Sequence, residues 1–198
     1  MPASVKINPA RARADALVVP EPPVWTTGDR WHFQTISAAG RRTTYTVRVD
    51  REETLEGVAY YVVKAGTRET FYRKSDLALS HDRVLGELET RSTPPRLYFV
   101  WPLAVGATWE QTYHFERFAN KYSYDASYAC SVEGEETVTV PAGTFRTLKI
   151  VYRTKSKKSV TWEQWYAPEV RMWVRMREPA LEEGERVREL LEFTPAGK

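Results

Sequence analysis

The chain has 198 residues, of which 42% are hydrophobic and 28% are charged, and its formal net charge is +3. This composition predicts one folded globular domain, or two closely fused halves, and excludes a disordered chain. Basic residues are scattered among acidic ones, which argues against a nucleic-acid-binding protein. The single cysteine cannot form an intramolecular disulfide or a cysteine-based zinc site, and the three histidines are dispersed. We therefore expect no metal and no cofactor.

Residues 1–24 are predicted to form a flexible, proline-rich N-terminal tether, because five prolines interrupt them and no hydrophobic period is sustained. Residues 25–198 are then expected to form a single barrel-like domain. No apolar run approaches the ~20 residues that a transmembrane helix needs, and no signal-peptide pattern opens the chain.

From Trp25 onward, polar and apolar residues alternate as they do in half-buried strands. The segment TYTVRVD places Tyr45, Val47 and Val49 on one face. The same period runs through YSYDASYAC (122–130) and RMWVRMR (171–177). The segment RVRELLEF (186–193) predicts a final strand, with a short helix as the alternative. A 13% aromatic fraction also suits pleated sheets, so we predict an all-β fold.

The stretch VTVPAGTFRTLKI (138–150) predicts a β-hairpin. Pro141 ends the first strand because proline cannot donate to a sheet ladder. Gly143 supplies the positive φ that a turn requires, and Val138 and Val140 are expected to point inward.

Three short matches suggest an internal repeat. They are GDRW (28–31) with GATW (106–109), EET (52–54) with EET (135–137), and TFYRKSD (70–76) with QWYAPEV (164–170). Their order is kept while the offset grows from 78 to 83 to 94 residues. Two similar meanders explain this pattern, with Trp31 and Trp109 buried at corresponding places. The alternative is that all antiparallel meanders look alike.

Four segments resemble an uncharacterised family of bacterial envelope proteins whose domains are similar to the LolA-like lipoprotein carriers. They are GDRW (28–31), WPLAVGATW (101–109), VTVPAGTFRTLKI (138–150) and WYAPEVRMWVRM (165–176). The resemblance implies a curved antiparallel sheet closed over by small helical or loop elements, and it covers residues 28–193. One departure is Glu169-Val170-Arg171, where the family has a glycine-rich turn. Together with the alternation, the resemblance predicts an open or half β-barrel of roughly ten to eleven antiparallel strands.

Catalytic signals are weak. No G-x-S-x-G elbow and no glycine-rich phosphate loop is present. Asp76, His81 and Asp82 lie close enough in sequence to form an acid–base group, but a polar turn between two strands explains them better. Cys130 lies among alternating tyrosines, which indicates a small buried apolar residue rather than a nucleophile. We therefore expect that the protein is not an enzyme.

An excess of aromatic residues indicates a lined concave face, although core packing accounts for most of them. The predicted ligand-binding residues are Trp101, Trp109, Tyr124, Trp162, Met172 and Met176, the methionines because thioethers adapt to varied shapes. We hypothesise non-enzymatic binding of a lipid or other apolar ligand in the bacterial cell envelope. The alternative is a structural or interaction module that binds an envelope protein. The resemblance predicts a periplasmic or outer-membrane-associated location and leaves the cytoplasm open.

Overall fold

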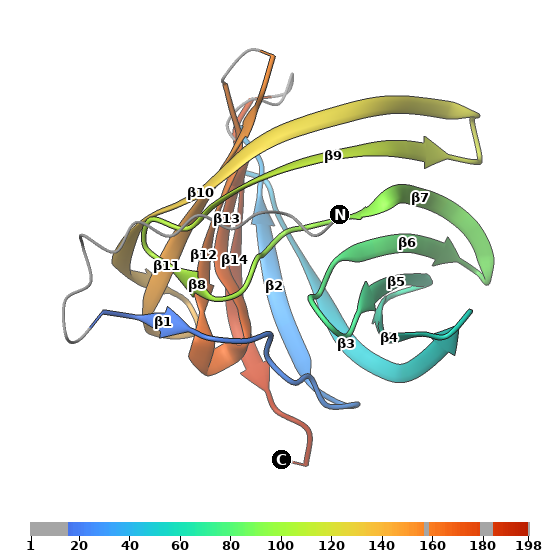
Figure 1. The fold of residues 1–198 in the computed structure, drawn as a ribbon. Helices are drawn as coiled ribbons and strands as arrows, with labels where there is room; N and C mark the ends of the chain where they lie inside the picture. Colours follow the sequence, from blue (N-terminus) through green and yellow to red (C-terminus); the bar gives the residue numbers. More distant parts are fainter. Residues whose placement is uncertain (1–15, 157–158, 179–183, 198) are drawn as a thin grey trace.

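The computed structural model describes residues 16–156, 159–178 and 184–197, and they form an all-β protein (Figure 1). Twelve strands form one closed antiparallel barrel in the order β10-β11-β12-β13-β14-β2-β3-β4-β5-β6-β7-β9. The prediction of an all-β antiparallel fold is confirmed. The prediction of an open or half barrel with ten to eleven strands is wrong, because β9 pairs with both β7 and β10 and closes the ring.

The barrel strands follow one another along the chain as hairpins, apart from the joins described below. They are β2 (Arg30–Ile36), β3 (Arg42–Leu55), β4 (Val58–Ala65), β5 (Arg68–Arg73), β6 (Leu79–Val84), β7 (Glu87–Arg96), β9 (Thr108–Arg117), β10 (Tyr122–Val140), β11 (Gly143–Thr154), β12 (Val160–Ala167), β13 (Met172–Glu178) and β14 (Arg186–Thr194). Residues 186–193, for which a short helix was the alternative, are a strand. In the described part of the chain, the 3-10 turn Pro168–Val170 is the one helical element.

The barrel divides into two six-stranded meanders, β2–β7 and β9–β14, which Figure 1 shows in cool and warm colours. Two seams join them. The β14–β2 seam aligns seven residue pairs, from Val187 opposite Ile36 to Thr194 opposite Arg30. The β7–β9 seam aligns only four, from Thr90 opposite Arg117 to Thr93 opposite His114. Because Pro94 and Pro95 follow at once and donate no backbone hydrogen bond, the two strands separate there.

Part of the predicted tether contacts the barrel. Val18–Val19 form the short strand β1, which pairs with β8 (Leu103–Ala104) in a separate two-stranded sheet. The backbone N–H of Leu17 donates to Glu135. Residues 1–15 of the predicted tether lie outside the described residues.

The first meander begins with a glycine turn. Gly28 has a φ of 104°, and its N–H donates to the carbonyl of Val49 on β3 at 2.8 Å. The N–H of Val49 returns a hydrogen bond to the carbonyl of Asp29 at 2.9 Å. A β-bulge follows in the β3–β4 pairing, between Val49 and Arg51.

The second meander begins with the same arrangement. Gly106 has a φ of 89° and donates to the carbonyl of Val132 on β10 at 2.9 Å, and Val132 donates back to Ala107 at 2.9 Å. Here too a bulge follows one residue later, between Val132 and Gly134 in the β10–β11 pairing. The Gly-x-x-Trp matches seen in the sequence therefore mark equivalent backbone structures.

The fourth strands of the two meanders, β5 and β12, also end in equivalent ways. The pairing of β5 with β6 shifts between Phe71 and Tyr72, and that of β12 with β13 shifts between Trp165 and Tyr166. The turns that follow contain Leu77 and Arg171, with φ values of 59° and 57°. Where the resembled family has glycine, this chain places Arg171 in the left-handed region.

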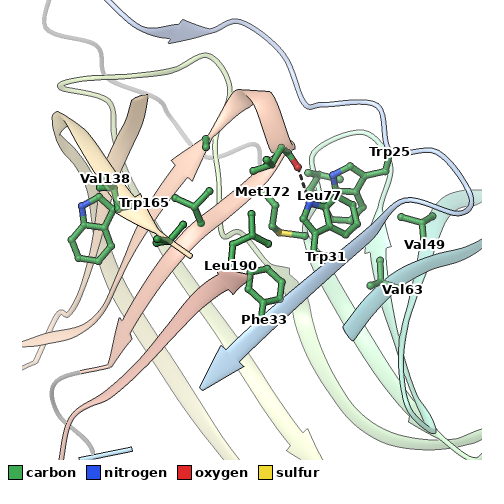
Figure 2. Close-up of a cluster of buried hydrophobic side chains, with 14 of the residues drawn as sticks. Trp25, Trp31, Phe33, Val49, Val63, Leu77, Val138, Trp165, Met172 and Leu190 are labelled. Carbon is green, nitrogen blue, oxygen red and sulfur yellow. Dashed lines mark hydrogen bonds between the residues drawn. The ribbon is translucent and has the colours of Figure 1, made fainter. Parts of the chain in front are cut away.

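The two predicted repeat tryptophans are both buried, Trp31 at 0% and Trp109 at 2% exposure, as the sequence predicted. The indole N–H of Trp31 donates to the carbonyl of Val170 at 2.7 Å, so the start of the first meander is bonded to a turn of the second (Figure 2). Trp31 also stacks against Phe193 at 5.4 Å, across the β14–β2 seam.

The Pro-Ala-Gly hairpin joins β10 to β11 as predicted, and Gly143 has a φ of 138°. Its tip lies against the neighbouring strands: Ala142 N–H donates to the carbonyl of Leu190, and the Arg175 guanidinium donates to the carbonyl of Thr139. Val138 and Val140 are buried in the cluster that contains Trp165, Val174 and Leu190. Neither valine lines the interior cavity described next, so their burial comes from packing of the hairpin on β12–β14.

Candidate functional site

Inside the barrel lies an apolar chamber of about 230 Å³ that is partly open to solvent. Strands β2 and β3 contribute Phe33, Tyr45 and Val47, and β13 contributes Met172, Trp173 and Met176. The remaining wall comes from Trp25, Val63, Tyr72, Leu77, Tyr98, Phe99, Gln164 and Arg188. Phe33 stacks on Trp173 at 4.2 Å and on Tyr45 at 5.5 Å, which fixes one side of the chamber. Burial raises the pKa of Tyr45 to about 12, so its hydroxyl stays neutral at physiological pH.

Arg188 lines the apolar chamber. It also lines an open polar recess beside the loop that follows β2, together with Arg41 and Arg186. Its guanidinium contacts the Met176 sulfur at 3.1 Å and pairs with Glu178 at 3.2 Å. This arginine therefore already has a carboxylate partner.

A side groove of about 730 Å³ lies where β7 and β9 separate, lined by Pro94, Pro95, Leu97, Phe99, Trp101 and Gln111 among others. Leu97 N–H donates to the Gln111 side chain at 3.0 Å, and this bond holds the 97–101 segment beside β9. Phe99 lines both the groove and the apolar chamber. The Phe99 ring therefore lies between the apolar chamber and the side groove at the β7–β9 seam.

A shallow recess of about 590 Å³ that is open to solvent, called here the polar chamber, is lined by Arg68, Asp82, Thr90, Arg96, Phe115, Arg117, Tyr122 and Tyr124. Asp82 is 8% exposed and accepts hydrogen bonds from Thr70 at 2.6 Å and Thr90 at 2.7 Å. Arg68 lies 3.4 Å from the same carboxylate. The adjacent Arg96 lies over the rings of Tyr98, Tyr113 and Phe115, and Tyr98 also lines the apolar chamber.

The six predicted ligand-binding residues are divided among different sites. Met172 and Met176 line the apolar chamber. Trp101 lines the side groove, and Tyr124 lines the polar chamber. Trp109 and Trp162 line none of these cavities; they belong to a second core cluster, where Trp162 stacks on Tyr152 at 4.4 Å.

Sequence reasoning missed most of the chamber lining. The alternation predicts that Tyr45 and Val47 share one face of a strand, and both residues line the apolar chamber. Trp25, Leu77 and Tyr98 lie outside the barrel strands, in segments without an alternating pattern. No periodic signal identifies such residues, because only the folded chain brings them to the lumen.

The residues weighed for catalysis do not form a group. Asp76 accepts hydrogen bonds from Arg73 and from Ala78 N–H in the turn between β5 and β6. His81 stacks on Phe71 at 4.1 Å, whereas the neighbouring Asp82 bonds Thr70 and Thr90. Because adjacent residues of a strand point to opposite faces, His81 and Asp82 cannot act together.

Cys130 is 3% exposed, and burial raises the pKa of its thiol to about 12, which disfavours the nucleophilic thiolate. Among the residues that the structure describes, no group of histidine, cysteine, aspartate and glutamate is arranged to hold a metal ion. Within the same residues, no helix has the length and apolar character needed to span a membrane.

No protein-family model matches the chain, and no curated protein matches it. Solved structures to which this chain is similar include a protein from Parabacteroides distasonis that is provisionally described as a lipoprotein. It is 16% identical with a TM-score of 0.46, and the match covers 89% of this chain and 97% of that one.

Another is a protein from Bacteroides fragilis, provisionally described as exported and as having a YmcC-like fold. It is 17% identical with a TM-score of 0.46, over 90% of this chain and 99% of that one. A third is the hypothetical lipoprotein YmcC from Escherichia coli, 11% identical with a TM-score of 0.40, over 86% of each chain. These descriptions do not name the LolA-like carriers, and no functional conclusion follows from likenesses at this level.

Proposed function

We propose that this protein is a non-enzymatic binding protein that holds the apolar part of a lipid or similar ligand inside its barrel. The observation that carries the proposal is the apolar chamber of about 230 Å³, walled by aromatic and thioether side chains. Pockets of this composition, with a few polar groups at their ends, are typical of small-molecule sites. Placement in the bacterial envelope, periplasmic or outer-membrane-associated, rests on the resemblance of the sequence motifs.

The chamber volume limits the ligand. It lies below the roughly 300–1,000 Å³ of pockets that enclose drug-sized molecules, so one short acyl segment suits it better than a whole lipid. Six buried methylene groups would contribute roughly 5 kcal/mol before the cost of association, at about 0.8 kcal/mol each. This corresponds at best to sub-millimolar binding, so tighter binding requires polar contacts as well.

Closure of the barrel weakens the alternative of an interaction module that pairs through a sheet edge. Each of the twelve barrel strands has a neighbour on both sides in the described structure. An envelope partner would therefore have to bind the outer surface, the β1–β8 ribbon or the side groove.

The decisive experiment is a titration of delipidated protein with laurate and with a short-chain phospholipid, followed by calorimetry and native mass spectrometry. We expect saturable one-to-one binding with a negative heat-capacity change, which marks burial of apolar surface. No saturable binding of either probe would reject the proposal.

Two variants of adjacent β13 residues sharpen the result. Met176→Trp adds bulk to the chamber and should abolish binding, because Met176 lines it. Arg177→Trp is the control, since Arg177 is exposed and pairs with Glu163 and Glu185 on the other side of the strand. Equal binding by the two variants would place the ligand elsewhere.

A further inference from the structure

The polar chamber contains Arg96, which forms no direct ion pair with any carboxylate of the described residues. Arg96 ends β7, and its guanidinium carbon lies 5.8 Å, 5.7 Å and 5.6 Å from the ring centroids of Tyr98, Tyr113 and Phe115. Among the residues that the structure describes, none forms an ion pair with Arg96. Cation–π contacts position a guanidinium over rings while its N–H groups stay available for an acceptor.

Two buried donors on this wall have no partner in the described part of the chain. They are Nε of Arg96 and Oγ of Ser92. Ser92 lies opposite Phe115 in the β7–β9 pairing, so it shares the face that carries Phe115 into the chamber. An unpaired buried donor costs about 1–3 kcal/mol, and an oxygen-rich ligand between these residues would remove that cost.

The charge of the chamber favours an anion. Arg68, Arg96 and Arg117 line it against one carboxylate, that of Asp82. The Asp82 oxygens already accept from Thr70 and Thr90 and lie near Arg68. Asp82 also attracts Arg96, but one carboxylate does not balance three guanidinium groups, so the chamber keeps a net positive charge.

Tyr98 links this chamber to the proposed ligand site, because it lines the apolar chamber on one side and lies under Arg96 on the other. Arg188, which also lines the apolar chamber, is already paired with Glu178. We propose that the ligand is an anionic amphiphile whose carboxylate or phosphate head binds Arg96 and Ser92 while its chain passes Tyr98 into the apolar chamber. This inference rests on the proposed function of that chamber.

The test compares three probes that share one chain length: laurate, dodecyl phosphate and dodecanol, each titrated by calorimetry. The charged probes should bind roughly tenfold or more tightly than dodecanol, since charge-assisted hydrogen bonds are the strong ones. Equal affinity for all three would overturn the inference and leave the proposed function standing. Binding of none of them would reject the proposed function and the inference together.

Variants locate the head group. Arg96→Met keeps the packing between the rings and should reduce the affinity for laurate and dodecyl phosphate to that for dodecanol, whose own affinity should not change. Arg91→Met is the matched control on the same strand, because Arg91 pairs with Glu116 and lies over Phe118. A preference for charged probes that survives in Arg96→Met would overturn the assignment.

Two further measurements complete the test. If Arg96→Met does not fold, as judged by circular dichroism, Ser92→Ala replaces it and should weaken only the charged probes, by several-fold. Inorganic phosphate, titrated alone and as a competitor, distinguishes a lipid head group from a free anion. If inorganic phosphate binds as tightly as dodecyl phosphate, the proposal of an amphiphilic ligand is rejected and the site binds a free anion.

Discussion

The two meanders start with the same backbone turn, but different side chains occupy it. In the first, Asp29 is fully buried and accepts hydrogen bonds from Thr26 N–H at 2.8 Å, Ala196 N–H at 2.9 Å and the Arg171 guanidinium at 2.9 Å. In the second, the equivalent position is Ala107, which is equally buried and only apolar. The turn itself therefore does not need the carboxylate; the carboxylate joins the turn at Thr26 to Ala196 and to the Arg171 turn.

The two seams between the meanders also differ in the hydrogen bonds that hold them. The seven-pair β14–β2 seam is reinforced by Trp31, by Asp29 and by Trp25, whose indole N–H donates to the Arg171 carbonyl at 3.0 Å. At the four-pair β7–β9 seam, the indole of Trp101 bonds the equivalent turn at Asp76 at 3.4 Å, a longer and weaker contact. The β7–β9 seam therefore has the weaker bonding. It lies beside the side groove and Arg96, and this position suits the entry of the proposed ligand.

The strongest test of this difference is Asp29→Ala, which makes the first turn resemble the second. We expect a loss of about 3 kcal/mol in the free energy of unfolding, because the Arg171 guanidinium and two backbone donors lose their acceptor. Urea denaturation measures it. Glu110→Ala, which breaks the exposed pair with Lys155, is the control and should change stability by less than about 1 kcal/mol. Similar losses in both variants would contradict the anchoring role of Asp29.

Replacing the tryptophan of each Gly-x-x-Trp motif should also lower the stability by different amounts. Trp31→Phe removes a short hydrogen bond to Val170 and should cost on the order of 2 kcal/mol. Trp109→Phe removes a 3.4 Å contact to the Leu97 carbonyl and should cost about 1 kcal/mol less. Denaturation of both variants under one condition makes the comparison, and a larger loss in Trp109→Phe would show that the second meander is the better anchored one.

The equivalent hairpins provide a smaller contrast. Gly143 has a φ of 138° and Gly57, in the β3–β4 hairpin, has a φ of 80°. Alanine should cost about 1 kcal/mol at Gly143 and less at Gly57, whose φ is nearer the left-handed well at about 57°. An added Cβ would meet only Phe145 at 3.7 Å in the first case and nothing within 4 Å in the second, so backbone strain decides the result. An unfolding midpoint of Gly143→Ala at or above that of the parent would remove this account.

The smallest effect is expected at Cys130. It pairs with Trp109 as Val47 pairs with Trp31, so valine occupies the equivalent place in the first meander. Cys130→Val should change stability by less than about 1 kcal/mol, since it loses only a weak contact of 3.7 Å with Gln111. A loss above 2 kcal/mol would mean that the thiol has a specific structural role.

The sequence by itself determined the local structure. Alternation located β3, β10, β11, β13 and β14, proline and glycine located the 141–143 turn with its positive φ, and the short repeats identified equivalent turns at Gly28 and Gly106. These features depend on neighbours in the chain, through side-chain period and backbone sterics. Burial of Trp31 and Trp109 followed from the same reasoning.

Only the tertiary structure decided the closure of the barrel, the cavities and the position of Arg96 over three aromatic rings. The pairs β14–β2 and β7–β9 join strands that are not consecutive, and no alternation pattern specifies which distant strands will meet. For the same reason Met172 and Met176 line a chamber while Trp109 and Trp162 pack in a core, although the sequence predicted all four as ligand-binding residues. A period of two assigns a residue to a face, but the curvature and closure of the whole sheet determine what that face encloses.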